Sequence, residues 1–331
     1  MSNAQLLRVA VIGLGAMGSR HAHVCRQMPG IELLGVADIK ADLAERLGSE
    51  LRVPAYADYK EMLQRLPLDA VVVATSDPFH VEPCQVAAAA GLHIFLEKPI
   101  ATTIEDGQAI IQAARQHGVK LMVGHTLRYD PRYKAIQQAV AAGKLGDVVH
   151  AYARRNATTW SGRRLAGRTE TMIFQGVHDL DALQWILESK ITRVYAEGVS
   201  KVLTDLGISD AIVTTLRFAS GAVALMEQSW ALPYGVPTLV DAQLEVVGSQ
   251  GAAYIDGRAP SFALFTDGKY TQPDIILHLP EQYYLRDEYA AFLSYVSGEA
   301  EPVVSGEVAL DALRVAHAVL QSMRSGKPVE L

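Results

Sequence analysis

A glycine-rich run near the N-terminus is the first feature of this sequence that could do chemistry. Gly13, Gly15 and Gly18 come directly after an apolar stretch that predicts a strand, and they open a stretch that predicts a helix. Glycines at this spacing permit a tight turn and bring backbone amides close to a pyrophosphate. The N-terminal amides of the helix then face the phosphates. We predict that a dinucleotide binds here, with contacts from Gly13, Gly15, Ala16, Met17 and Gly18.

The second predicted strand ends in an acidic residue that would select the cofactor. Asp38 lies 20 residues after Gly18, where an acid accepts hydrogen bonds from the adenosine ribose. Its charge would also repel the 2′-phosphate of NADP. We therefore predict that the cofactor is NAD, although the nearby Lys40 leaves NADP open. The alternative is an ordinary aspartate at the end of a strand.

A third chemical signal is the tripeptide Glu97-Lys98-Pro99, which follows the fifth predicted strand. Ligands of open α/β sheets bind at the carboxyl ends of the strands. A lysine at this edge can hydrogen-bond a substrate oxygen and stabilise negative charge that develops on it. The alternative is a surface ion pair between Glu97 and Lys98, which would contribute little.

The elements that must position these residues follow from the pattern of apolar residues. Short apolar runs that do not alternate in polarity are separated by helical stretches, which predicts a parallel sheet covered on both faces. This is the doubly wound Rossmann arrangement, and we assign it to a dinucleotide-binding domain at residues 1–124. Its predicted strands cover residues 8–12, 31–37, 70–74, 92–96 and 120–123, and its helices cover 17–27, 41–51, 81–90 and 104–117.

Beyond this boundary the pattern changes to longer strands with few helices. Such a pattern predicts an α+β domain with an open, largely antiparallel sheet, and we assign it to residues 125–331, for substrate binding and oligomerisation. The predicted strands cover residues 148–156, 191–202, 211–230 with a turn at 219–221, and 242–255. The predicted helices cover residues 131–142, 172–187, 285–296 and 308–323.

Composition narrows the class of protein. The 331 residues suggest two domains at roughly 150 residues each. A net charge of -6 without a long basic stretch argues against nucleic acid as a partner. Cys25 and Cys84 share no CxxC spacing and fit a reducing compartment. We see no secretory signal and no apolar run near the roughly 18 residues that span a bilayer, so we expect a cytoplasmic protein without a membrane partner.

Four motifs occur along the chain in a fixed order. They are the glycine run, TSDPFH at residues 75–80, Glu97-Lys98-Pro99, and GVHDLD at residues 176–181, where a helix of the second domain begins. In order and spacing this combination resembles the Gfo/Idh/MocA oxidoreductase family, which includes glucose-fructose oxidoreductase and inositol dehydrogenase. The resemblance covers essentially the whole chain. It implies an NAD(P)-dependent dehydrogenase that acts on CH–OH groups of a sugar, cyclitol or related hydroxy compound.

The resemblance also implies roles for individual residues. In that family the lysine of the Glu-Lys-Pro motif and a histidine of the second domain flank the substrate; here these are Lys98 and His178. His178 would take the hydroxyl proton, since an imidazole with a pKa of roughly 6.5 suits a base at neutral pH. Lys98 would hold the oxygen while hydride moves to the nicotinamide. Thr75, His80 and Glu97 would lie against the cofactor, although His80 could simply start a helix.

One family position differs in this sequence. Members that resemble inositol dehydrogenase carry an aspartate four residues before the histidine, where this chain has Phe174. Phenylalanine cannot accept a proton or a hydrogen bond, so we do not expect the polyol-binding geometry of inositol dehydrogenase to be retained unchanged. Gln175 could supply a polar contact to the substrate instead. Asp181, one helical turn after His178, could orient that histidine or bind a hydroxyl, or it could cap the helix.

Arginines supply a further set of candidate substrate contacts. Arg128 could line the active-site cleft or tie the domains together. The stretch from Arg154 to Glu170 is rich in arginine although the chain is acidic, and guanidinium groups bind carboxylates and phosphates in bidentate fashion. We predict that Arg163 or Arg168 holds an acidic group of the substrate or the pyrophosphate. The alternatives are a solvated loop or arginines that bridge subunits.

The same sequence leaves two other functions open. An NAD-dependent glycosidase and a catalytically silent NAD-binding regulatory protein are the alternatives to a dehydrogenase. His178 and Asp181 have a spacing that could bind a metal, but no third ligand stands out, so we predict no metal.

Apolar residues at successive positions in 222–226 predict a sheet buried on both faces, and hence a dimer or tetramer that forms through the C-terminal sheet.

Overall fold

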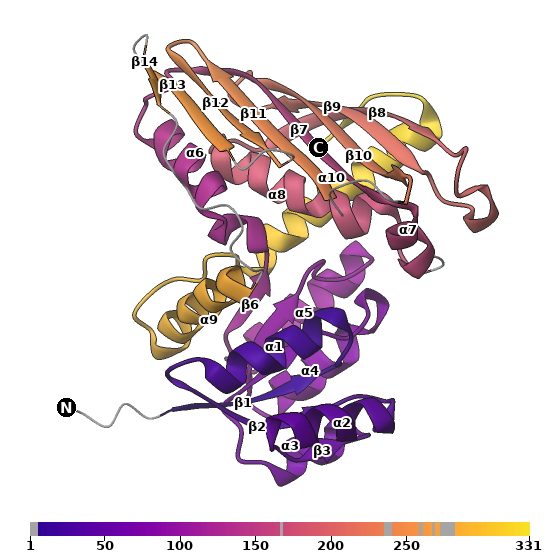
Figure 1. Ribbon diagram of the computed structural model, residues 1–331, viewed down its shortest axis with the longest axis vertical. Coiled ribbons are helices and arrows are strands. Elements are labelled where there is room, and N and C mark those ends of the chain that lie inside the picture. The colour runs from indigo at the N-terminus through magenta and orange to yellow at the C-terminus, as the bar shows by residue number, and fades with distance from the viewer. Residues whose placement is uncertain (1–5, 166–167, 235–239, 258–260, 267–268, 272–281) are drawn as a thin grey trace. The chain divides into compact units, whose positions relative to one another are not determined.

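The computed structural model describes residues 6–165, 168–234, 240–257, 261–266, 269–271 and 282–331 (Figure 1). The chain divides into two compact units. The first comprises Met1–Thr126 and Pro280–Leu310, and the second comprises Leu127–Leu279 and Asp311–Leu331. The boundary predicted after Gly124 therefore lies close to the division after Thr126, but the segment Pro280–Leu310 returns to the first unit. Every helix in the described residues is too short or too polar to cross a bilayer.

The first unit contains the predicted Rossmann sheet. Six strands pair in the order β3-β2-β1-β4-β5-β6, and every pairing is parallel. The strands are β1 (Leu7–Ile12), β2 (Ile31–Ala37), β3 (Ala55–Tyr56), β4 (Ala70–Val73), β5 (His93–Glu97) and β6 (Leu121–Gly124). The helices are α1 (Ala16–Gln27), α2 (Ala41–Leu51), α3 (Tyr59–Arg65), α4 (Val81–Ala89), α5 (Ile104–Gln116) and α9 (Gln282–Ser297), with short 3-10 turns η1 (Asp77–Phe79) and η2 (Thr126–Tyr129).

Helix α9 belongs to this unit because it completes the core on one face of the sheet. Its side chains Leu285, Tyr289 and Phe292 are fully buried against residues of α1 and the central strands. Burial of each large apolar side chain stabilises the fold by roughly 1.5–3 kcal/mol. The sequence predicted this helix but assigned it to the second domain, since periodicity reveals an apolar face and not what that face packs against.

The order of the strands brings two loops together at the carboxyl edge of the sheet. β1 lies between β2 and β4, so the loop after β1 meets the loop after β4. Gly13 has a φ of +86°, and a Cβ there would lie 2.6 Å from the backbone nitrogen of Thr75. A Cβ on Gly18 would lie 1.7 Å from the carbonyl oxygen of Gly13. Only glycine permits both approaches, as the motif predicted.

The second unit contains an open nine-stranded sheet. The order is β14-β13-β12-β11-β7-β10-β9-β8-β15; β7 and β10 pair in parallel and the other neighbours are antiparallel. The strands are β7 (Val148–Thr158), β8 (Ile191–Val199), β9 (Ala211–Phe218), β10 (Val223–Leu232), β11 (Val240–Gly248), β12 (Gly251–Asp256), β13 (Ser261–Thr266), β14 (Lys269–Thr271) and β15 (Val329–Glu330). The single strand predicted for 242–255 is thus a hairpin.

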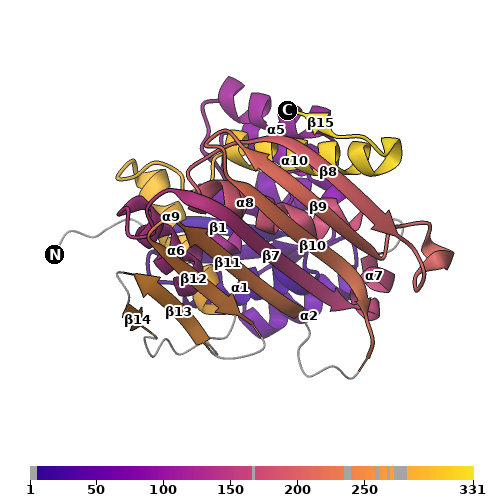
Figure 2. The ribbon, with the colours of Figure 1, turned by 90° about the horizontal axis from the view of Figure 1, so that it is seen from above.

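Helices cover one face of this sheet and leave the other open. In Figure 2, α6, α8 and α10 lie together behind the strands. The helical elements of this unit are α6 (Pro131–Ala141), α7 (Thr159–Leu165), a π-helical turn η3 (Met172–Gly176), α8 (Val177–Ile186), η4 (Thr204–Leu206) and α10 (Gly306–Ser325), whose first residues belong to the first unit.

Strand β9 and the start of β10 are buried on their helix-facing side. Along β9, Ile212 and Leu216 are buried while Val213 and Arg217 are exposed. On β10, Val223 and Leu225 remain 43% and 40% exposed, so the burial of both faces predicted from the apolar run does not occur within the chain itself. We call the open side the outer face of the sheet.

Candidate active site

The glycine loop is held in place by the acidic residue at the end of β2. The backbone amide of Leu14 donates to Asp38 Oδ2 at 2.7 Å, and the amide of Lys40 donates to Oδ1 at 2.9 Å. Helix α1 starts at Ala16 without a hydrogen bond from a capping side chain. Its first amides therefore suit a phosphate, as predicted for Gly13–Gly18. A Cβ on Gly15 would meet open space, which leaves room for a ligand against the backbone.

The loop after β4 lies next to the glycine loop and is fixed by a buried histidine. His80 is 1% exposed, and its Nε2 lies 3.2 Å from the carbonyl oxygen of Thr75. Its Nδ1 lies 3.0 Å from the carbonyl oxygen of Pro99 in the next loop. Burial lowers the pKa of His80, against the opposing charge of Asp77. His80 therefore joins the loops after β4 and β5, a role that the motif alone did not indicate.

The residues at the end of β5 combine a buried acid with a partly exposed base. Glu97 is 5% exposed, and its Oε2 accepts a hydrogen bond of 3.1 Å from the backbone amide of Lys98. Its Oε1 lies 2.7 Å from Nε2 of His21 on α1. Lys98 itself is partly exposed beside this carboxylate. Glu97 is therefore a buried carboxylate that binds His21 and the backbone amide of Lys98.

In the second unit, two buried ion pairs hold the helix that carries His178. Arg155 donates to both carboxylate oxygens of Asp179 at 2.9 Å. Arg128 donates to both oxygens of Asp181 at 2.9 and 2.7 Å, and Asp181 is 1% exposed. Both acids thus face the interior of the unit, whereas His178 in the same turn of α8 is partly exposed.

The predicted substrate contacts Arg128 and Asp181 therefore bind each other, and this buried pairing anchors α8. Gln175 is also engaged within the unit: its amide nitrogen donates to the carbonyl oxygen of Arg155 at 2.6 Å, and its Oε1 accepts from the indole of Trp230 at 3.0 Å. Direct roles of these residues in substrate binding stay predictions.

Phe174 occupies the family's aspartate position within the π-helical turn. Its ring lies 6.4 Å from that of Trp230, and it packs against a small apolar cluster that includes Leu165, Leu203 and Ile208. An apolar side chain therefore fits its surroundings here. The turn before His178 is rigidified by packing where the family pattern has an acid.

The arginines between Arg154 and Glu170 bind different partners. Arg154 forms an ion pair with Asp241 at 2.9 Å, and Arg163 forms an exposed one with Asp205 at 2.8 Å. Such an exposed pair contributes little to stability, so Arg163 could exchange its partner for a ligand. The predicted roles of Arg163 and Arg168 toward an acidic group stay predictions.

Sequence reasoning gave no role in the site to three buried residues. His21, Glu288 and Tyr289 all lie within the first unit near Glu97. The place of His21 in the helix that follows the glycine loop, three residues after Gly18, was a usable signal. Among the described residues, no group of three or more histidine, cysteine, aspartate or glutamate side chains is arranged to hold a metal.

Two family models match the chain. Residues 7–125 match an oxidoreductase family with an NAD-binding Rossmann fold, and residues 133–254 match the GFO/IDH/MocA C-terminal domain. Together these segments include parts of both units and all four sequence motifs. The resemblance inferred from the motifs is confirmed.

Individual relatives agree with the family models. The chain is 29% identical to myo-inositol 2-dehydrogenase of Thermotoga maritima, over 98% of each chain. It is also 29% identical to scyllo-inositol 2-dehydrogenase (NAD(+)) of Bacillus subtilis, over 98% of this chain and 96% of the relative. Among solved structures, myo-inositol 2-dehydrogenase from Lactobacillus plantarum matches with a TM-score of 0.86 and 26% identity, covering 99% of this chain and all of the other.

We expect Asp38→Ala to weaken NAD binding by roughly 10- to 150-fold, since a hydrogen bond to a charged group contributes about 1.5–3 kcal/mol. NADP binding should fall less or improve, because a negative charge is removed. Titration of each cofactor, followed by fluorescence, gives both dissociation constants. Asp38→Asn is the matched control, since it keeps an acceptor for the Leu14 amide. Equal losses for both cofactors in Asp38→Ala, with no NADP gain in Asp38→Asn, would make Asp38 a loop anchor only.

Proposed function

The chain belongs to the GFO/IDH/MocA family of NAD-dependent oxidoreductases acting on CH–OH groups, and from this premise we propose that it oxidises a secondary alcohol of a cyclitol or a closely related polyol. The relatives named inositol 2-dehydrogenase, which match the chain over nearly its full length, support this substrate class. The supporting observation within the structure is the position of Lys98: it follows β5 at the edge of the sheet where the glycine loop follows β1.

The first unit would hold the cofactor. The amides of Gly13–Gly18 and the start of α1 would bind the pyrophosphate, and Asp38 would bind the adenosine ribose. When bound, NAD supplies the acceptor for the hydride that leaves the carbinol carbon. Thr75, His80 and Glu97 would shape the site beyond the glycine loop. The open space at Gly15 and the uncapped start of α1 fit this assignment.

Two side chains would carry the proton chemistry. Lys98 would donate a hydrogen bond to the reacting hydroxyl oxygen and stabilise the negative charge that develops on it. His178 would accept the hydroxyl proton as a general base. The ion pairs of Asp179 and Asp181 support this role, because they fix the first turn of α8 while leaving His178 partly exposed.

The buried free thiols of Cys25 and Cys84 are consistent with a reducing, cytoplasmic location, and we propose that location for the protein. Burial raises the pKa of Cys25 to about 12, so this thiol is inert at neutral pH. Neither cysteine therefore contributes to the chemistry.

A panel of cyclitols, polyols and sugars, screened by NADH absorbance, tests the proposed function. We expect stoichiometric NADH with at least one cyclitol and none without substrate. An NAD-dependent glycosidase would release a sugar product with no net NADH, and a regulatory protein would bind NAD without turnover. Either of these outcomes would contradict the proposal.

We expect Lys98→Met and His178→Asn each to lower kcat by about 10²–10⁴-fold while NAD affinity stays nearly unchanged. The reason is that these side chains would act on the substrate, whereas the pyrophosphate binds at the glycine loop. Steady-state kinetics together with NAD titration measure both effects. Nearly full turnover in His178→Asn would show that the proton leaves by another route.

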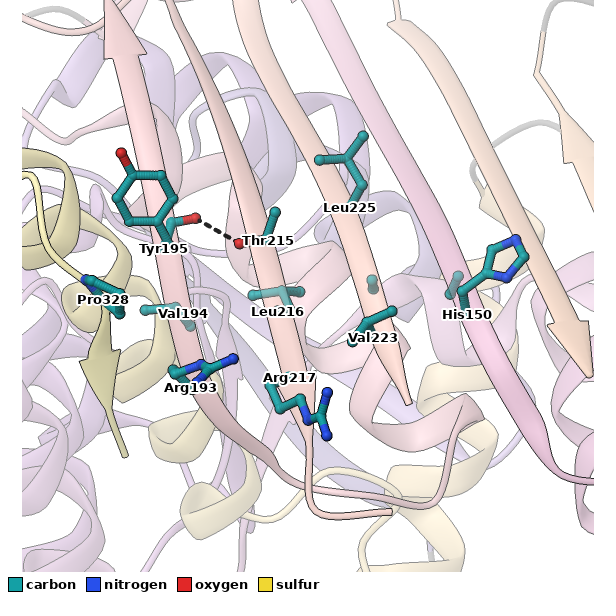
Figure 3. Close-up of a pocket in the computed structure, with 12 residues that line it drawn as sticks. His150, Arg193, Val194, Tyr195, Thr215, Leu216, Arg217, Val223, Leu225 and Pro328 are labelled. Carbon is teal, nitrogen blue, oxygen red and sulfur yellow. Dashed lines mark hydrogen bonds between the residues drawn. The ribbon is translucent and has the colours of Figure 1, made fainter. Parts of the chain in front are cut away.

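A second copy of the chain is the proposed partner of the outer face of the second sheet. This face carries exposed Val213, Val223 and Leu225, and it holds a cavity of about 560 Å³ over β7–β10 (Figure 3). Arg193 and Arg217 are register neighbours at one side of the cavity, and Figure 3 shows them beside each other. Like charges directly opposite destabilise a sheet, so this pair favours a partner that brings acids.

The chain itself carries the acids that such an arrangement needs. Register places Arg193, Arg217 and His150 in one row across the strands, and Glu197, Glu227 and Arg154 in another, with Tyr195 and Leu225 in the row between. The second row remains acidic because Arg154 forms an ion pair with Asp241. A two-fold axis along the rows would set the basic row of one copy on the acidic row of the other. An axis along the strands would set like charges together. We therefore propose a dimer whose two-fold axis runs along the rows, perpendicular to the strands.

Charge reversal tests this dimer. Arg193→Glu and Glu197→Arg should each weaken association by at least about 10-fold, because they place like charges together, and the double variant should restore it. Sedimentation velocity at micromolar concentration measures the dissociation constants. Arg65→Glu, an exposed change on α3, is the control. A monomeric parent protein, or a double variant as weak as the singles, would contradict the proposed axis.

A further inference from the structure

A buried histidine reaches the acid next to Lys98 from the helix that follows the glycine loop. His21 on α1 is 0% exposed, and its Nε2 lies 2.7 Å from Oε1 of Glu97. A carboxylate can only accept, so Nε2 carries a proton and donates it to this hydrogen bond. The other oxygen of Glu97 accepts from the backbone amide of Lys98. One carboxylate thus links α1 to the backbone of the residue proposed to touch the substrate.

The position of His21 is itself fixed by residues from the returning chain. The hydroxyl of Tyr289 on α9 lies 2.8 Å from Nδ1 of His21. The His21 ring also makes edge contacts with Phe95 on β5 and with Tyr289, with centroids 5.4 and 5.7 Å apart. Both ring nitrogens therefore have partners, and aromatic rings restrict the rotation of the imidazole.

A second buried histidine holds the other end of the same loop. His80 places Nδ1 3.0 Å from the carbonyl oxygen of Pro99 and Nε2 3.2 Å from that of Thr75. Lys98 therefore lies between Glu97, which is bound by His21, and Pro99, which is bound by His80. Hydrogen bonds from His21 on α1 and from His80, which directly precedes α4, thus fix both neighbours of Lys98.

We propose that His21 and His80 are positioning residues that clamp the segment Glu97-Lys98-Pro99 and thereby hold the Lys98 amine in place for the substrate. This inference rests on the role proposed above for Lys98. Neither histidine touches the reacting atoms. Their effect is transmitted through the carboxylate of Glu97 and the backbone of Pro99.

The clamp also keeps a negative charge beside Lys98. Burial by itself would raise the pKa of Glu97. The hydrogen bond from His21 and the charge of Lys98 lower this pKa by more than burial raises it, so the net shift is downward. Burial and the charge of Glu97 raise the pKa of Glu288 on α9. The groups that face Glu97 are Lys98, His21 on α1, His80 before α4, and Glu288 and Tyr289 on α9.

The loss of His21 has a defined consequence for the pH profile. Without its hydrogen bond the pKa of Glu97 rises, so the carboxylate becomes protonated at a higher pH than in the parent. Lys98 then loses its neighbouring charge over that range. The acid limb of the kcat profile should move to higher pH. A residue that merely fills space would lower stability without moving this limb.

The test compares His21→Leu, which removes both ring nitrogens, with His21→Gln, whose amide can still donate toward Glu97. We expect His21→Leu to lower kcat by about 10- to 100-fold, the scale of a small misplacement of a reacting group, and to shift the acid limb upward. His21→Gln should recover part of both, and the NAD dissociation constant should change less than about 2-fold. His23→Leu is the matched control, since that ring contacts Ser19 and Glu50 near the surface of the same helix.

A second readout separates this inference from the proposed function. The rate of reaction of Lys98 with an amine reagent, followed by mass spectrometry against pH without substrate, reports the pKa of its ammonium group. Because loss of the clamp frees the Lys98 side chain, we expect its rate of reaction at a fixed pH to change in His21→Leu and to stay the same in His23→Leu, even if no cyclitol is oxidised. An unchanged Lys98 profile, or equal losses of kcat and NAD affinity, would overturn the clamp.

Two further variants keep the test decisive. Should His21→Leu fail to fold, Tyr289→Phe removes only the hydroxyl that supports His21, and we expect a smaller change in the rate of reaction of Lys98. His80→Leu should lower kcat about 10-fold or more, and His80→Gln should recover part of it, because its amide can donate to a carbonyl oxygen. Parent-like kinetics and Lys98 reactivity in both Tyr289→Phe and His80→Leu would overturn the proposal.

Discussion

The carboxylate of Glu97, buried at the end of β5, is the constraint on which the first unit depends. A carboxylate removed from water costs several kcal/mol unless hydrogen bonds and opposite charge offset the loss. Here the offset comes from His21 on α1 and from the amide of Lys98, and His21 is in turn supported by Tyr289 on α9. The chain must therefore return to the first unit, because the residue that completes this network lies nearly 200 positions further along the sequence.

The second unit handles buried charge differently. Around α8, two aspartates are each matched by a bidentate arginine from a separate element, η2 or β7. Removal of one partner of such a pair costs about 3–5 kcal/mol, because the other charge stays buried and unpaired. The start of α8 is thereby fixed in rotation as well as in position. A general base benefits from this rigidity, since proton transfer requires the imidazole to stay within hydrogen-bond reach of the hydroxyl.

The sequence was informative wherever local chemistry decides structure. The glycine spacing, the five long strands of the first sheet and the helix that begins near His178 all follow from periodicity and turn chemistry. The partners of the polar groups could not be predicted from periodicity or turn chemistry. Arg128, Gln175 and Asp181 were assigned to the substrate because their types suit a ligand, yet each has a partner inside the second unit. Spacing identifies residues that share a helix, but it does not reveal which distant element faces them.

Phe174 shows how the surroundings of a site accommodate a change within it. Its ring lies beside Trp230, whose indole donates to Gln175. Phe174 and Gln175 therefore both contact a residue of strand β10. An aspartate at this position would need a partner in an apolar cluster. Phe174 therefore suits its apolar surroundings, and no carboxylate lies four residues before His178.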